Sequence, residues 1–276
     1  MNNNTQQDAT RLALKIRQRI FQGARSSPAR GAHFGASLSC TDILASAATV
    51  WSLESTLSSD STRITLSKGH ACLALYALLL EKGLISEHEF ASIQTNGSIY
   101  PGHPLINRDK QIYFSTGSLG QGLANAVGQA LFHKLKVNAS SPMIIAVVGD
   151  GECSEGIFYE SLMLASQYRL SNLLVVIDNN GYQQTGSTAE ISNSISWMPF
   201  LRSLGVSCSE VSDGNDVHLL ISAFHSIKES TSDAPHVLVA NTSKGYGISF
   251  MQDSNEYHYG SLTSDLHNLA LTELAT

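Results

Sequence analysis

Charged residues are scarce in this sequence, particularly those with a positive charge. Asp, Glu, Lys and Arg make up 14% of the 276 residues, and the net charge is −6. A surface that binds nucleic acid or anionic membranes needs clustered lysine and arginine. The chain has no such cluster, so we expect neither a nucleic-acid nor a membrane partner. The low charge instead favours extensive burial, as in an oligomer.

Long apolar runs and paired cysteines are also missing. No apolar run reaches the roughly 20 residues that a membrane helix needs, and residues 1–20 lack the apolar centre of a signal peptide. The four cysteines lie far apart and form no C-x-x-C pair, which argues against a disulfide framework or a zinc site. We therefore expect an unprocessed, soluble protein in the cytoplasm.

The most informative stretch is a strand-helix-strand unit in the middle of the chain. The apolar run Met143–Val148 ends at the sequence GDG, and a second run, Leu173–Ile177, ends at Asp-Asn-Asn. Between them, helical spacing of apolar residues predicts a helix over 154–169. In such a unit both strand ends meet at one edge of a parallel sheet, so Asp150 and Asn180 should lie side by side. Their oxygens suit a hard cation such as Mg²⁺ or Ca²⁺.

The remaining pattern predicts an α/β fold with a parallel sheet flanked by helices on both faces. The length of the chain suits a single domain over residues 1–276. A segment rich in glycine and proline, Gln22–Gly35, should interrupt the first helix, and Thr41 should cap the next. Further helices are expected at 71–83, 86–95, 217–228 and 262–274 and after residue 118, with strands at 63–66, 205–211 and 236–243.

Glycines around Asp150 allow backbone amides to approach an anion while the carboxylate faces a cation, so a metal-bridged diphosphate uses both. An isolated GDG is more often an ordinary tight turn. Here the second strand, ending in Asn179-Asn180, favours a ligand site. A nucleophile elbow with a Ser-His-Asp or Cys-His order is absent, and no G-x-G-x-x-G follows a strand, which argues against hydrolases and dinucleotide-binding enzymes.

The chain has ten histidines, and four of them lie in glycine-bearing turns. These are His33, His70, His103 and His258. A lone loop histidine is more often structural than catalytic, and spacing alone does not show that the four share a site. The others lie in helical or strand patterns and are expected to be structural: His88, His133, His218, His225, His236 and His267.

Taken together, these motifs resemble the amino-terminal half of transketolase, a thiamine diphosphate enzyme. The resemblance extends over nearly the whole chain. The matching segments are HFGA at 33–36, LSKGH at 66–70, GHP at 102–104, STGSLGQGLANAVG at 115–128, the GDG and NN pair, DGND at 213–216 and the late His258. Six ordered motifs of this kind are a specific signature.

The resemblance implies roles for individual residues. Asp150, Asn180 and the backbone oxygen of Tyr182 match the ligands of the divalent metal that holds the diphosphate, and Gly151, His70 and His258 match its contacts. The other matches are Gly117 and Leu119 beside the aminopyrimidine, Glu155 linking two active sites across a dimer interface, and His33 and His103 facing the sugar. With His258 and Glu155, these two histidines form the expected catalytic set, because histidines can shuttle protons around the cleaved bond.

The sequence also departs from the family pattern. Phe34 stands where transketolases usually have proline, and Asn215 stands where they often have histidine. The second, pyrimidine-binding domain of full-length transketolase has no counterpart here and is expected on a partner chain. The resemblance thus implies the first subunit of a split transketolase, an α2β2 heterotetramer acting on sugar phosphates.

Two alternatives remain open at this point. The same scaffold supports other thiamine diphosphate reactions, such as 1-deoxyxylulose-phosphate synthesis or decarboxylation of a 2-oxo acid. The second alternative is of a different class: the chain could be a noncatalytic binding or assembly subunit that has kept the fold but lost turnover. The retained histidines and metal-binding residues argue against this second alternative.

Overall fold

The structure is a computed structural model that describes residues 3–26, 31–53, 61–136, 141–192 and 195–275. Its centre is a sheet of five parallel strands in the order β2-β3-β4-β6-β5. The strands are β2 (Arg63–Leu66), β3 (Ile144–Gly149), β4 (Leu173–Asn179), β5 (Ser207–Val211) and β6 (His236–Asn241). This topology confirms the parallel α/β fold predicted from the sequence.

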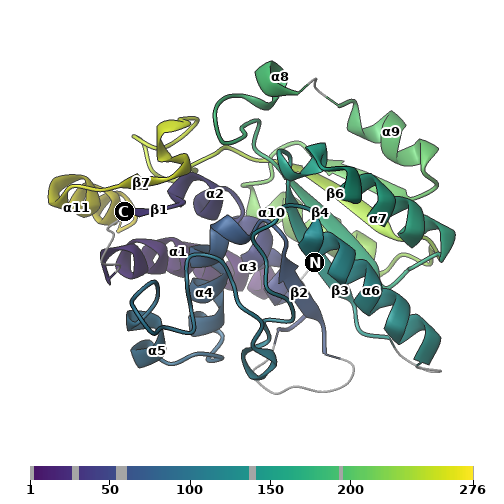
Figure 1. Ribbon diagram of the computed structural model, residues 1–276, viewed down its shortest axis with the longest axis horizontal. Helices are drawn as coiled ribbons and strands as arrows, with labels where there is room; N and C mark the ends of the chain where they lie inside the picture. The colour runs from purple at the N-terminus through teal and green to yellow at the C-terminus, as the bar shows by residue number, and fades with distance from the viewer. Residues whose placement is uncertain (1–2, 27–30, 54–60, 137–140, 193–194, 276) are drawn as a thin grey trace.

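Helices cover both faces of the sheet (Figure 1). One layer contains α1 (Asn3–Ser26), α3 (Thr41–Val50), α4 (Cys72–Glu81) and α10 (Val217–Lys228), and the other contains α6 (Gln121–Lys136), α7 (Gly156–Gln167) and α9 (Trp197–Ser203). Side chains alternate along β3, so Ile145 and Val147 face the first layer while Ala146 and Val148 face the second. Burial on both faces explains why β3 is apolar throughout.

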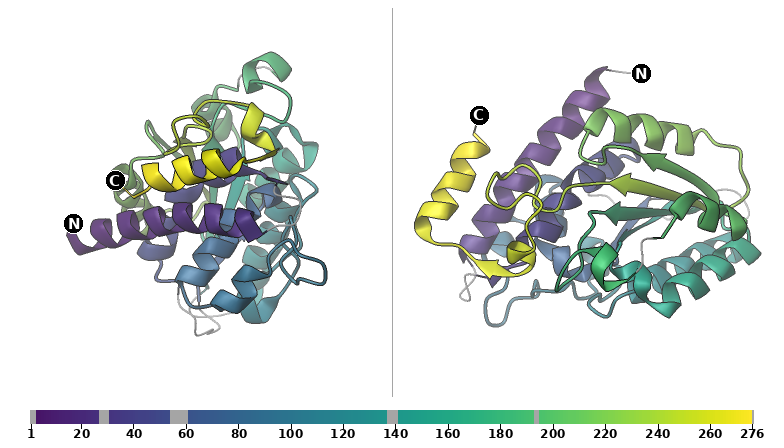
Figure 2. Two further views of the ribbon diagram at one scale, coloured as in Figure 1. Left: turned by 90° about the vertical axis from the view of Figure 1, so that its left-hand side faces the viewer. Right: turned by 90° about the horizontal axis from the view of Figure 1, so that it is seen from above.

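Smaller elements surround these layers. They are α2 (Phe34–Ser39), α5 (Glu87–Ala91), α8 (Thr188–Ile191), α11 (Ser264–Glu273) and 3-10 helices at Gly69–Ala71, Arg108–Lys110, Glu152–Ser154 and Glu256–His258. A short antiparallel pair, β1 (Gly31–Ala32) with β7 (Gly260–Ser261), joins the two ends of the chain. Figure 2 shows α11 beside α1. None of the helices in the described ranges is long and apolar enough to cross a bilayer.

Three predicted helix boundaries were wrong. The first helix passes through Gly23, where a break was expected. A Cβ at Gly23 would lie 2.5 Å from Ile93 Cδ1, so the glycine at this position permits close packing of the helix against Ile93. Thr41 does not cap the next helix; Cys40 precedes it, and the Thr41 hydroxyl donates to the Ser37 carbonyl at 2.8 Å. The polar helix expected at 86–95 is only the short α5.

The parallel strands all end at the same edge of the sheet. Gly149 at the end of β3 pairs with Asp178 on β4, and Asn179 pairs with Asn241 on β6. Asp150 and Asn180 follow directly, as the sequence predicted, and the LSKGH segment follows β2 at the same edge. The edge therefore collects polar side chains from four separate parts of the chain.

Core packing can be tested with two phenylalanines that lie on different helices. Phe224 on α10 is 0% exposed and packs edge-to-face on Trp51, whereas Phe132 on α6 is 54% exposed. We expect Phe224→Ala to lower the free energy of unfolding by about 3–5 kcal/mol, because it leaves a cavity. Phe132→Ala is the matched control and should change it by less than about 0.5 kcal/mol. Urea denaturation measures both, and equal losses would contradict the assigned core.

Candidate functional site

A cavity of about 620 Å³ opens at the carboxyl edge of the sheet. It brings together every site residue predicted from the sequence: His33, His70, His103, Gly117, Leu119, Asp150, Gly151, Glu155, Asn180, Tyr182 and His258. The other histidines do not line it. Because the residues come from segments far apart in the chain, the cavity exists only in the folded protein.

The expected metal ligands form one end of the cavity. The Asp150 carboxylate is buried and accepts hydrogen bonds from Gly181 N at 2.8 Å and Thr188 Oγ1 at 2.9 Å. Asn180 Oδ1 accepts from Tyr182 N at 3.1 Å. Burial raises the pKa of Asp150, and the hydrogen bond from Thr188 opposes that shift. A bound cation would favour the ionised carboxylate.

These ligands fit a hard cation. Among the described residues, no group of three or more His, Cys, Asp or Glu side chains is placed to hold a metal ion. The expected set instead contains one carboxylate, one amide oxygen and one backbone carbonyl, which are ligands typical of Mg²⁺ and Ca²⁺. A single carboxylate leaves much of a divalent charge uncompensated, so the set suits a metal that also binds an anion.

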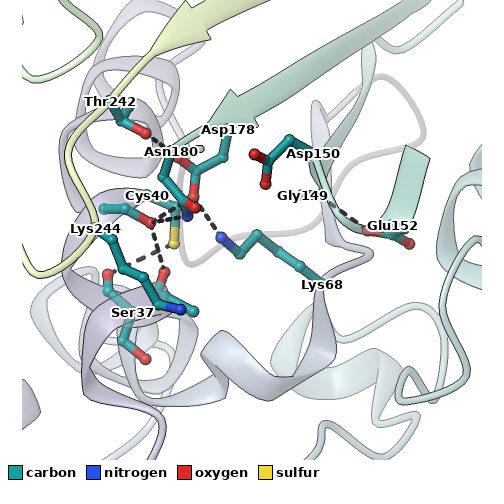
Figure 3. Close-up of polar contacts among 12 residues, drawn as sticks. Ser37, Cys40, Lys68, Gly149, Asp150, Glu152, Asp178, Asn180, Thr242 and Lys244 are labelled. Atoms are coloured by element: carbon teal, nitrogen blue, oxygen red, sulfur yellow. Dashed lines mark hydrogen bonds and ion pairs between the residues drawn. The ribbon is translucent and has the colours of Figure 1, made fainter. Parts of the chain in front are cut away.

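Two buried lysines border this end, and the sequence motifs assigned them no role (Figure 3). Lys68 pairs with Asp178. Burial lowers the pKa of Lys68, but the charge of Asp178 outweighs it and the net shift is upward. Lys244 donates to Asn255 and lies 3.3 Å from His258 Nδ1. Burial and the charge of Lys68 lower the pKa of Lys244 to about 8. Both lysines closely follow strand ends, a signal that could have identified them.

A third buried group, Glu152, holds the loops around the cavity together. Its carboxylate accepts from Gly120 N at 2.7 Å, from Gly149 N at 3.1 Å and from the Ser67 hydroxyl. Ser67 Oγ in turn accepts from Leu123 N at 2.9 Å. Burial raises the pKa of Glu152, and these hydrogen bonds oppose the shift. Glu152 thus fixes the start of α6 against the ends of β2 and β3.

The four turn histidines meet in the cavity. The ring centroid of His33 lies 5.3 Å from that of His70, 5.5 Å from that of His258 and 5.9 Å from that of His103. Burial lowers the pKa of His33 and of His258 to about 4, and lowers that of His70 well below its usual value. These three imidazoles are therefore neutral at pH 7 and able to accept a proton.

The remaining predicted residues lie toward the open side. Gly117 has φ +154°, and a Cβ there would lie 3.5 Å from His103 Cδ2. Leu119 is partly exposed, and Glu155, directly before α7, is exposed. These positions leave the surface of the cavity accessible to a ligand or to another chain.

The two departures from the family pattern lie outside the cavity lining. Phe34 is buried and stacks on Phe21, with ring centroids 5.5 Å apart. Asn215 Nδ2 donates to Asp42 Oδ2 at 3.0 Å, and its Oδ1 accepts from Ser243 N at 2.8 Å. Phe34 thus serves the core, and Asn215 orients the segment that leads to Lys244.

Comparisons with known proteins show which family this chain matches. A family profile described as the transketolase, thiamine diphosphate binding domain, matches residues 17–273. An apulose-4-phosphate transketolase subunit from Phocaeicola vulgatus is 34% identical over 251 residues, which is 90% of this chain and 87% of that protein. The 6-deoxy-6-sulfo-D-fructose transketolase subunit SqwG of a Clostridium species is 34% identical over 212 residues, covering 77% and 76% of the two chains.

A solved transketolase structure has the same fold as this chain. The crystal structure of transketolase from Campylobacter jejuni aligns with a TM-score of 0.85 and 25% sequence identity. The alignment covers 100% of this chain but 43% of that one. This chain therefore spans less than half the length of that transketolase.

Protonation of the histidine cluster gives a pH prediction. The pKa of His33 and of His258 is about 4 in the folded chain, against 6.5 ordinarily. Between these values the unfolded chain binds more protons, so the free energy of unfolding should fall as pH drops from about 6.5 toward 4. NMR titration of the imidazole protons measures the two pKa values. His33→Asn should reduce the pH dependence and the exposed His88→Asn should not; values near 6.5 for both buried rings would contradict the prediction.

The buried ion pair gives a second prediction. Asp178→Asn leaves the Lys68 ammonium buried without a counterion and should lower the free energy of unfolding by about 3–5 kcal/mol. Asp233, which pairs with Arg169 on the surface, provides the matched control, and Asp233→Asn should leave stability nearly unchanged. Urea denaturation at pH 7 compares them, and a harmless Asp178→Asn would show that the buried pair is dispensable.

Proposed function

Because the chain belongs to the transketolase thiamine diphosphate-binding domain family, we propose that it is the thiamine diphosphate- and metal-binding subunit of a two-chain transketolase. The assembled enzyme transfers a two-carbon ketol unit from a ketose phosphate to an aldose phosphate. The observation that carries this proposal is the single cavity in which a hard-cation site, two lysines and a cluster of histidines meet.

The charged end of the cavity supports binding of a metal and a diphosphate. Asp150, Asn180 and the backbone oxygen of Tyr182 hold the divalent metal, Mg²⁺ or Ca²⁺. Gly151 and His70 contact the diphosphate together with His258. Lys244 is buried and lines the cavity, which supports a further role for it in compensating diphosphate charge.

The open side supports a shared active site. Gly117 and Leu119 lie against the aminopyrimidine, and Glu155 links the two active sites of the assembly. The pyrimidine-binding domain is then supplied by a partner chain, in an α2β2 heterotetramer built from this single diphosphate-binding domain. Two relatives that are named as transketolase subunits match this chain over most of their length, which supports the division.

The histidines transfer protons to and from the substrate. When bound, thiamine diphosphate provides the nucleophilic carbon and the electron sink. His33 and His103 face the sugar, where they accept protons from and return them to the hydroxyl and carbonyl groups around the cleaved bond. The low pKa of His33 keeps that ring neutral at pH 7, with one ring nitrogen free to accept a hydrogen bond from the sugar.

The sugar itself is less defined than the reaction. One relative is named for apulose-4-phosphate and another for 6-deoxy-6-sulfo-D-fructose, so ketol transfer recurs in these names while the sugar changes. These names favour ketol transfer over 1-deoxyxylulose-phosphate synthesis or 2-oxo acid decarboxylation. Incubating the assembled enzyme with pyruvate and, separately, with ketose phosphates distinguishes the reactions.

Reconstitution tests the proposed assembly. The purified chain alone should be nearly inactive, because the groups that activate the aminopyrimidine and grip the phosphate of the sugar are expected on the partner. Mixing it with a pyrimidine-domain subunit, Mg²⁺ and thiamine diphosphate should produce ketol transfer in a coupled assay. Strong transferase activity from the chain alone would contradict the split enzyme. His33→Ala or His103→Ala without loss of activity would favour an assembly role.

The metal site is tested by Asp150→Ala. Loss of the carboxylate removes the only acidic metal ligand of the site, so thiamine diphosphate affinity in the presence of Mg²⁺ should fall by at least about tenfold. Titration calorimetry measures this affinity on the assembled complex, and circular dichroism verifies the fold. Asp265→Ala, a substitution on α11 outside the cavity, is the control and should bind normally. Unchanged binding by Asp150→Ala would show that the metal site lies elsewhere.

A further inference from the structure

An exposed tyrosine borders the histidine cluster. Tyr259 lines the cavity, and its ring centroid lies 4.9 Å from that of His33 with the planes inclined at 63°. The antiparallel pairing of Ala32 with Gly260 brings these two residues together from opposite ends of the chain. Tyr259 is 55% exposed, which is more than the partly buried His33 beside it.

The position of the ring is built into the fold. A Cβ at Gly31 would lie 2.9 Å from the Tyr259 hydroxyl oxygen and 3.0 Å from its Cζ. Because Gly31 has no side chain, the Tyr259 ring can pack directly against the backbone of β1. Within the part of the chain that the structure describes, no residue hydrogen-bonds to the Tyr259 hydroxyl, which leaves it available to a ligand.

The cavity has a deep end and a rim. Asp150 and Asn180 at the metal end are buried, whereas Tyr259 is largely exposed and contacts His33. The two carbons that are transferred react where the cofactor is held, within reach of the histidines. The rest of the donor sugar then extends toward the rim, where the aromatic ring stands.

We propose that Tyr259 is a specificity-determining residue that contacts the carbon chain of the donor sugar beyond the cleaved bond. Its ring face packs on the C–H groups of the chain, and its hydroxyl bonds a sugar hydroxyl. A tyrosine suits this role because it combines a rigid apolar surface with a polar tip. The inference rests on the proposed ketol transfer and extends it to the sugar chain.

Kinetics of the reconstituted complex test the inference. Tyr259→Ala should raise the KM for a ketose phosphate by about fivefold or more, because an aromatic contact is lost. The KM for 3-hydroxy-2-oxopropanoate should stay unchanged, since this donor carries the same ketol group but a carboxylate in place of the sugar chain. Tyr259→Phe separates the hydroxyl from the ring and should give an intermediate KM.

Gly31→Ala provides an independent test of the ring position. It should displace the ring and raise the KM for the ketose phosphate in the otherwise unchanged chain. In a chain that already carries Tyr259→Ala, the same substitution should add little, because the two act through one contact. Thiamine diphosphate affinity, measured by calorimetry, should be the same in all these variants, which shows that the cofactor site is intact.

The possible results separate the two levels of the proposal. If the complex without substitutions transfers no ketol unit, the proposed function fails and the role of Tyr259 falls with it. If ketol transfer occurs but Tyr259→Ala leaves the KM for the ketose phosphate unchanged, only the role of Tyr259 is overturned. An equal rise in KM for both donors, or weaker partner binding with unchanged KM, would also overturn it by assigning Tyr259 to general site structure or to the interface between the two chains.

Discussion

The buried ion pair between Lys68 and Asp178 is the contact on which the carboxyl edge depends. Lys68 follows β2 and reaches past Gly149 at the end of β3 to Asp178 on β4, so one side chain spans three strands (Figure 3). Asp178 also accepts hydrogen bonds from the hydroxyls of Ser39 and Thr242. Two desolvated charges are stable there because each has its partner in place, and the pair connects the end of β2 with the end of β4.

The cavity combines charged groups with neutral imidazoles. Its deep end gathers Asp150 with the two lysines, where an anion and a cation can be held together. Its other side gathers imidazoles that burial keeps neutral at pH 7. Lys244 links the two sides, because it lies 3.3 Å from His258 Nδ1 and its positive charge adds to burial in lowering the pKa of His33 and of His258.

The local parts of the fold and site were predictable from the sequence. Alternating and helical spacing predicted the unit from β3 to β4, and parallel topology then placed Asp150 beside Asn180. The glycine turns selected the four histidines of the cavity. Helix boundaries at Gly23 and Thr41 were wrong because they depend on what the helix packs against: a glycine that interrupts an isolated helix can equally permit contact with Ile93.

The sequence by itself determined the five strands of the sheet, the main helices and the residues that carry recognisable motifs, because these depend on near neighbours; the short elements β1, β7, α2, α8 and α9 were not predicted. The tertiary structure alone decided the contacts between distant groups that no motif indicated. Lys68 and Asp178 are 110 positions apart, and Gly120 and Glu152 are 32 apart. Tyr259 reaches His33 through the pairing of the chain's two ends. Such contacts follow from packing and from the need of buried polar groups for partners, which no local pattern encodes.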